Sequence, residues 1–168
     1  MARGKYIIFL DSDDELCDNA IETINHWRLK TGIDSNDKIS ELRFRYIYAH
    51  DKSIVGNNIL NNNECEKGWA IRYSKQCQYR LKLRFDMLLV QKASVCKTYK
   101  FTELNYSEHC SEGITHNEVR NVYDFYLVNV VLGKLYRHER DGETHLAYGY
   151  KLLKWPRGNY LGVLAVLK

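Results

Sequence analysis

The sequence predicts an α/β domain in which a mixed sheet is flanked by helices. The apolar run at residues 5–10 stops abruptly at a cluster of acids, which is typical of a buried strand. Residues 39–50 alternate with a period of two, as a strand does, whereas residues 20–29 and 113–123 repeat apolar side chains at helical spacing. A chain of 168 residues with 45% hydrophobic and 27% charged residues can bury a core, so residues 1–168 are expected to form a single domain.

The first predicted strand spans residues 5–10. Its continuous apolar character is that of a strand buried on both faces in a mainly parallel sheet. The first predicted helix spans residues 20–29, where Ile21, Ile24 and Trp27 recur at three-residue spacing. Asn19 stands where it can cap this helix.

A long alternating strand is predicted over residues 39–50. Its apolar positions are Leu42, Phe44, Tyr46 and Tyr48, and they alternate with Glu41, Arg43, Arg45 and Ile47. Glycine and asparagine mark turns at residues 56–58 and 61–63, and residues 69–73 are expected to add a further strand.

The second half of the chain repeats the pattern of strands and helices. An apolar segment at residues 85–91 leads into a short helix through residues 93–96. A helix over residues 113–123 is followed by a strand-like run at residues 125–136. The apolar residues 161–167 are expected to pack as a helix.

Composition narrows the setting of the protein. The formal charge of +4 is spread along the chain without a basic arm, so no nucleic-acid partner is expected. Five cysteines without a C-x-x-C pair indicate free thiols in a reducing cytosol. No apolar run reaches the roughly 20 residues of a membrane span. The expected location is cytoplasmic, with any membrane tie peripheral at the inner face.

Residues 11–14, with the sequence Asp-Ser-Asp-Asp, follow the first predicted strand directly. In an open α/β sheet, ligands bind in the crevice outside the carboxyl ends of the strands, where carboxylates can meet a metal ion or a phosphate. An acidic turn can equally solvate a loop, and Asp14 can cap the following turn. His109 and His116 lie seven residues apart and are expected to be surface or packing histidines.

The string ARGKYIIFLDSDD at residues 2–14 resembles the D-x-D segment of family 2 glycosyltransferases, which have the GT-A fold and invert the transferred sugar. Residues 86–103 are similar to the family segment that leads toward the acceptor site. Residues 111–117 and 154–160 are similar to a bacterial branch in which a Pro-Glu-Gly stretch replaces the commoner Glu-Asp pair, with Ser111 in place of the proline.

The resemblance implies a role for three carboxylates. Asp11 and Asp13 would bind Mg²⁺ or Mn²⁺ and the nucleotide-sugar donor, most simply a UDP-sugar, because side chains at i and i+2 at a strand end can converge on one ion. Glu112 would be the general base that takes the proton from a carbohydrate acceptor. Glu112 can also be an acid favoured by a helix N-terminus, and Glu103 and Glu108 are nearby rivals for its role.

The resemblance begins at the D-x-D strand, so the family's N-terminal nucleotide-binding strands have no counterpart in this sequence. The expected fold is therefore a partial GT-A fold, a truncated catalytic domain that retains the metal and acceptor side and has weak or no activity. An edge exposed along residues 5–10 would favour homo-oligomers. The expected setting is cell-surface polysaccharide synthesis in a bacterium. A non-catalytic binding or assembly module is the alternative, and a metal-dependent phosphotransferase or hydrolase ranks third, because no P-loop is visible.

Overall fold

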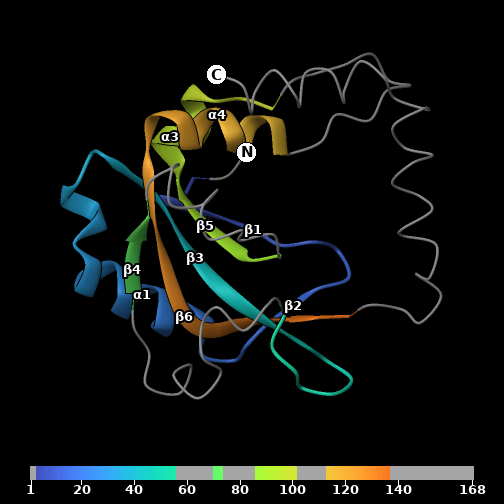
Figure 1. Ribbon diagram of the computed structural model, residues 1–168. Coiled ribbons are helices and arrows are strands. Elements are labelled where there is room, and N and C mark those ends of the chain that lie inside the picture. Colours follow the sequence, from blue (N-terminus) through green and yellow to red (C-terminus); the bar gives the residue numbers. More distant parts are fainter. Residues whose placement is uncertain (1–2, 56–69, 74–85, 102–112, 137–168) are drawn as a thin grey trace, which may run out of the picture.

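The computed structural model describes residues 3–55, 70–73, 86–101 and 113–136, which form one mixed sheet with helices on both faces (Figure 1). The sheet runs in the order β1-β5-β3-β6-β2, and β4 also pairs with β6. Its strands are β1 (Tyr6–Phe9), β2 (Glu15–Leu16), β3 (Ile39–Tyr48), β4 (Ala70–Tyr73), β5 (Leu88–Lys92) and β6 (Asp124–Leu135). The predicted α/β class with a mixed sheet is confirmed.

The sheet is largely antiparallel, which corrects the expectation of a mainly parallel one. Among the described strands only β3 and β6 run parallel, with a register that shifts at three places. Strand β5 is antiparallel to both β1 and β3. Strand β6 pairs antiparallel with β4 along its first half and with β2 near its end. The apolar run of β1 had suggested burial on both faces, but all four of its residues are only half-buried.

Helix α1 (Ala20–Thr31) follows the acidic turn and is joined to β3 through the short 3-10 helix η1 (Ile33–Ser35). Asn19 occupies the N-cap position with φ −94° and ψ 18°, and its side chain makes no capping hydrogen bond, so the predicted cap is wrong. Gly32 ends the helix in the left-handed region at φ 62°, and its N–H donates to the Leu29 carbonyl at 3.3 Å.

The main core lies between α1 and the sheet. Ala20, Ile24 and Trp27 of α1 pack on one face of the strands, and Trp27 is only 4% exposed. The apolar side chains of the sheet in this cluster include Leu42, Phe44, Tyr46, Leu88, Val90, Val128 and Leu132. The sequence alternation of β3 therefore identified the correct core face.

The opposite face of the sheet carries α3 (Ala93–Thr98) and α4 (Gly113–Val122). Here the polar positions of β3 are buried as deeply as the apolar ones, with Glu41, Arg43 and Arg45 each no more than 1% exposed. Arg43 donates to Glu41 through Nε at 2.6 Å, and its guanidinium lies 3.8 Å from the centre of the Phe125 ring. Gln91 donates to the other carboxylate oxygen at 3.1 Å. This ion pair is the polar centre of the second layer.

Several predictions fall on residues outside the described ranges. These are the turns at 56–58 and 61–63, the helix at 161–167 and the first residue of the strand at 69–73. The remaining residues of that strand form β4. The other helices and strands match their predicted positions within a few residues. In the described parts of the chain, no helix has both the length and the apolar character needed to cross a membrane.

Candidate functional site

The candidate site is the acidic turn that follows β1. Asp14 N–H donates to the Asp11 carbonyl at 3.1 Å, which closes the turn. Asp11 and Asp13 are exposed, whereas Asp14 is half-buried. The strand before the turn and the short β2 after it fix the two ends of this loop, so its exposed carboxylates project from an ordered backbone.

Tyr46 anchors the turn from the centre of the sheet. Its ring is 4% exposed, and its hydroxyl hydrogen-bonds the Asp14 carboxylate. The backbone N–H of Tyr136 donates to the same carboxylate. Burial raises the pKa of Asp14, the Tyr46 hydrogen bond works against that rise, and the charges of Asp11 and Asp13 add to it. Asp14 is thus the internal attachment of the turn, while Asp11 and Asp13 face outward.

Gly133 on β6 makes room for Tyr46. A Cβ at this position would lie 2.3 Å from Cε1 and 2.6 Å from Cδ1 of the Tyr46 ring, well inside any allowed contact. Glycine is therefore required if the tyrosine ring is to lie across β6 and reach Asp14.

Asp86 brings a fourth carboxylate to the same end of the sheet. It lies two residues before β5, and because β5 runs antiparallel to β1, the start of β5 lies beside the end of β1. Burial raises the pKa of Tyr46, and the nearby charges of Asp14, Asp11 and Asp86 raise it further. Sequence reasoning missed both Asp86 and Tyr46, because only the pairing of strands far apart in the sequence brings them to the turn.

The far end of the turn is tied to β6 through Glu15. Lys134 Nζ lies 2.9 Å from Glu15 Oε1, and the Tyr136 hydroxyl donates to Glu15 Oε2 at 2.7 Å. These contacts lower the pKa of Glu15 and raise the pKa of Lys134. The exposed Lys134–Glu15 ion pair contributes little to the stability of the fold. Its contacts, together with that of Tyr136, place Lys134 and Tyr136 beside the acidic turn.

The oxygen donors of the turn suit a hard divalent cation. Mg²⁺ is commonly bound through one or two carboxylates together with substrate phosphates and water, so two exposed aspartates are a sufficient protein contribution. Within the described ranges, no three acidic, histidine or cysteine side chains converge as a complete metal cage. Asp11 and Asp13 are the two exposed aspartates that this turn offers as oxygen ligands.

The other predicted site residues lie elsewhere or outside the description. Glu112, the predicted general base, and its rivals Glu103 and Glu108 are outside the described residues, as is His109. His116 lies on α4 and packs edge-on against Phe9, with ring centres 5.7 Å apart. Burial lowers the pKa of His116 to about 4, as expected for a neutral packing histidine.

Comparisons with known proteins identify no relative of this chain. No family model matches the sequence, and neither the curated proteins nor the solved structures contain a significant match.

Proposed function

We propose that the chain is a glycosyltransferase of the family 2 type, or a fragment of one, with a partial GT-A fold. It would transfer a sugar from a nucleotide-sugar donor to a carbohydrate hydroxyl with inversion of configuration, in cell-surface polysaccharide synthesis at the cytoplasmic side of the membrane. The observation that carries this proposal is the exposed Asp11–Asp13 pair on an ordered turn at the carboxyl end of β1.

The donor is assigned to the acidic turn. Asp11 and Asp13 would hold Mg²⁺ or Mn²⁺ through their carboxylate oxygens, and the ion would neutralise charge that develops on the departing nucleoside diphosphate. Asp14 is not assigned to the ion, because its carboxylate already accepts hydrogen bonds from Tyr46 and from the backbone of Tyr136. A UDP-sugar is the proposed donor class.

The acceptor is assigned to the segment that contains Glu112. The Glu112 carboxylate would take the proton of the acceptor hydroxyl while that oxygen attacks the anomeric carbon, and the bond to the nucleoside diphosphate would break on the opposite face of the sugar. This assignment rests on the resemblance of residues 111–117.

Calorimetric titration with UDP tests the donor assignment. We expect saturable binding of UDP that requires Mn²⁺ and weakens by more than about tenfold in Asp13→Asn. Asp18→Asn is the matched control, because Asp18 is an exposed aspartate beyond β2. A folded chain that fails to bind UDP and Mn²⁺ would refute donor binding by this chain and favour a non-catalytic binding or assembly module.

Product analysis tests the reaction. A UDP-sugar and an oligosaccharide acceptor should give transfer, and Glu112→Gln should lower its rate, whereas Glu103→Gln and Glu108→Gln should not. Release of sugar to water alone, never to a carbohydrate hydroxyl, would replace the transferase assignment with a hydrolase.

A further inference from the structure

Strand β1 forms one end of the described sheet. Its residues pair with β5 on one side, from Tyr6 opposite Lys92 to Phe9 opposite Leu89, and no described strand pairs with its other side. Edge strands are commonly protected by charged residues, proline or bulges, and Tyr-Ile-Ile-Phe contains none of these. Within the described part of the chain, this edge is therefore an apolar template for a further strand.

The backbone groups available on this edge can be identified. Ala93 N–H donates to the Lys5 carbonyl at 2.9 Å, so Lys5 directs its backbone groups toward β5. Because these directions alternate along an antiparallel pair, Ile7 and Phe9 also face β5. The N–H and C=O groups of Tyr6 and Ile8 point away from it, toward the free edge.

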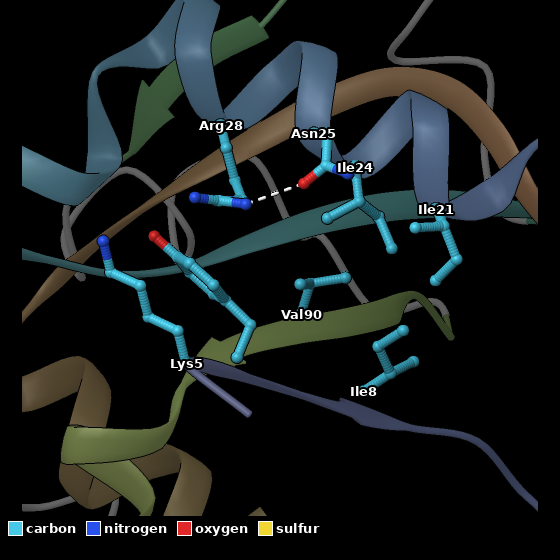
Figure 2. A pocket seen from close by; sticks show the side chains of 8 residues that line it. Lys5, Ile8, Ile21, Ile24, Asn25, Arg28 and Val90 are labelled. Carbon is cyan, nitrogen blue, oxygen red and sulfur yellow. Dashed lines mark hydrogen bonds between the residues drawn. The ribbon is translucent and has the colours of Figure 1, made fainter. Parts of the chain in front are cut away.

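The surface beside the edge is apolar on the side that α1 covers. A cavity of about 210 Å³ lies between β1, β5 and α1. In Figure 2, Ile21 and Ile24 of the helix are directed toward Ile8 and Val90. Ile21 is 60% exposed. Lys5 and Arg28 lie at the other end of this cavity, so its apolar floor is bordered by cations.

We propose that β1 pairs antiparallel with β1 of a second copy of this chain, about a two-fold axis at Ile7. Tyr6 of each copy then lies opposite Ile8 of the other, and all the outward backbone groups of Tyr6 and Ile8 join in four hydrogen bonds. Shifting the register by one residue would place backbone groups that face β5 at the new interface. Shifting it by two would leave half of the outward groups without partners.

The same register brings similar surfaces together. Residues opposite one another in an antiparallel pair project to the same side, so the α1 helices of both copies cover one face of a continuous sheet. The exposed Ile21 side chains and the apolar cavities then border the junction on that face.

Charge complementarity extends beyond the strand ends. Arg3 precedes β1 and Asp11 follows it, so antiparallel pairing brings Arg3 of one copy toward Asp11 of the other, and symmetry repeats this approach. Arg3 and Asp11 are both exposed. The basic segment before β1 therefore runs beside the acidic turn that follows β1 of the second copy, which favours antiparallel over parallel pairing.

Cysteine cross-linking tests the register. At the two-fold axis the two copies of residue 7 form a non-hydrogen-bonded pair with Cα atoms about 4.5 Å apart, within disulfide range. Under mild oxidation, Ile7→Cys should give a covalent dimer whose disulfide joins the two copies of residue 7 by peptide mapping. Leu29→Cys, at a position 79% exposed on α1, is the accessibility control and should stay monomeric on denaturing gels. Cross-linking of both variants to the same extent would overturn the proposal.

Sedimentation across protein concentration tests the assembly itself. The unmodified chain should pass from monomer to dimer and no further. Arg3→Glu should weaken the dimer by about five- to tenfold, and a compensating Asp11→Arg should restore it. Lys100→Glu, the same charge change at another exposed position, should leave the dimer unchanged. A strictly monomeric chain, or open-ended growth beyond the dimer, would refute the closed pairing, and neither result depends on donor binding.

Discussion

Replacing Glu41 with glutamine should strongly destabilise the fold. The carboxylate is 1% exposed and accepts hydrogen bonds from the Arg43 guanidinium and from Gln91. Burial raises the pKa of Glu41, but the nearby Arg43 and Arg120 charges hold it below its usual value, so the group is ionised at neutral pH. Glu41→Gln removes that charge and leaves the buried Arg43 cation without its counter-ion.

The expected cost is about 3–5 kcal/mol, the range observed when one partner of a buried ion pair is removed. With a typical urea dependence of about 2 kcal/mol per molar, the unfolding midpoint should fall by roughly 2 M. Circular dichroism during urea titration measures this directly. Glu22→Gln on the exposed side of α1 is the matched control and should leave the midpoint unchanged.

A double substitution separates the buried charge from the lost contacts. Glu41→Leu together with Arg43→Met removes both charges, and an apolar pair of similar volume commonly restores most of the stability of a buried ion pair. We therefore expect the double variant to be more stable than Glu41→Gln. A midpoint shift below about 0.5 M in Glu41→Gln, at the same urea dependence, would show that Arg43 finds compensation elsewhere and would refute the reasoning.

Three further predictions concern single positions. The pKa of His116 is about 4 in the folded chain and about 6.5 in the unfolded chain, so the unfolded chain binds more protons between these two pH values. The free energy of unfolding should therefore fall by roughly 3 kcal/mol from pH 7 to pH 4. His116→Gln should remove this pH dependence, whereas the control His26→Gln should not. Gly133→Ala should lower the free energy of unfolding in urea by about 1–3 kcal/mol and weaken Mn²⁺–UDP binding, because the new Cβ displaces the Tyr46 ring. Unaltered binding by the destabilised variant would contradict the role of Tyr46 in anchoring the acidic turn. Gly32→Ala should lower the free energy of unfolding by about 1 kcal/mol, because φ at this residue is 62° and no other atom contacts the new methyl group. Gly32→Asn should lower it by less, and equal losses in the two variants would argue against backbone strain.

The sequence predicted helices and strands well where a periodic pattern was long. Strand β3 and helix α1 were identified with their apolar faces, because alternation and helical spacing report directly on burial. The two-residue β2 was missed, since its position between acids carries no pattern. Strand direction was also wrong: β1 is apolar throughout because α1 packs on one of its faces and Phe101 and His116 pack on the other.

The candidate site was predictable only in its local part. Asp11 and Asp13 adjoin an apolar strand, so their exposure at its carboxyl end followed from the sequence. The contributions of Tyr46 and Asp86 depend on which strands pair and in which register, and both residues lie more than 30 positions from the turn. The Asn19 cap failed for a different reason, because the backbone at this residue is not extended as a side-chain cap requires.

The acidic turn and the edge of β1 are adjacent in the sequence, and the proposed pairing brings the turn of one copy close to the other copy. Within one copy, the turn is attached through Asp14 to the Tyr46 hydroxyl and to the backbone of Tyr136. The proposed pairing uses the outward backbone groups of Tyr6 and Ile8. Because that pairing also brings Arg3 of one copy toward Asp11 of the other, cross-linking the Ile7→Cys variant should weaken Mn²⁺–UDP binding, since the guanidinium competes with the metal ion for the Asp11 carboxylate. Unaltered affinity in the cross-linked dimer would show that Arg3 of one copy does not reach Asp11 of the other.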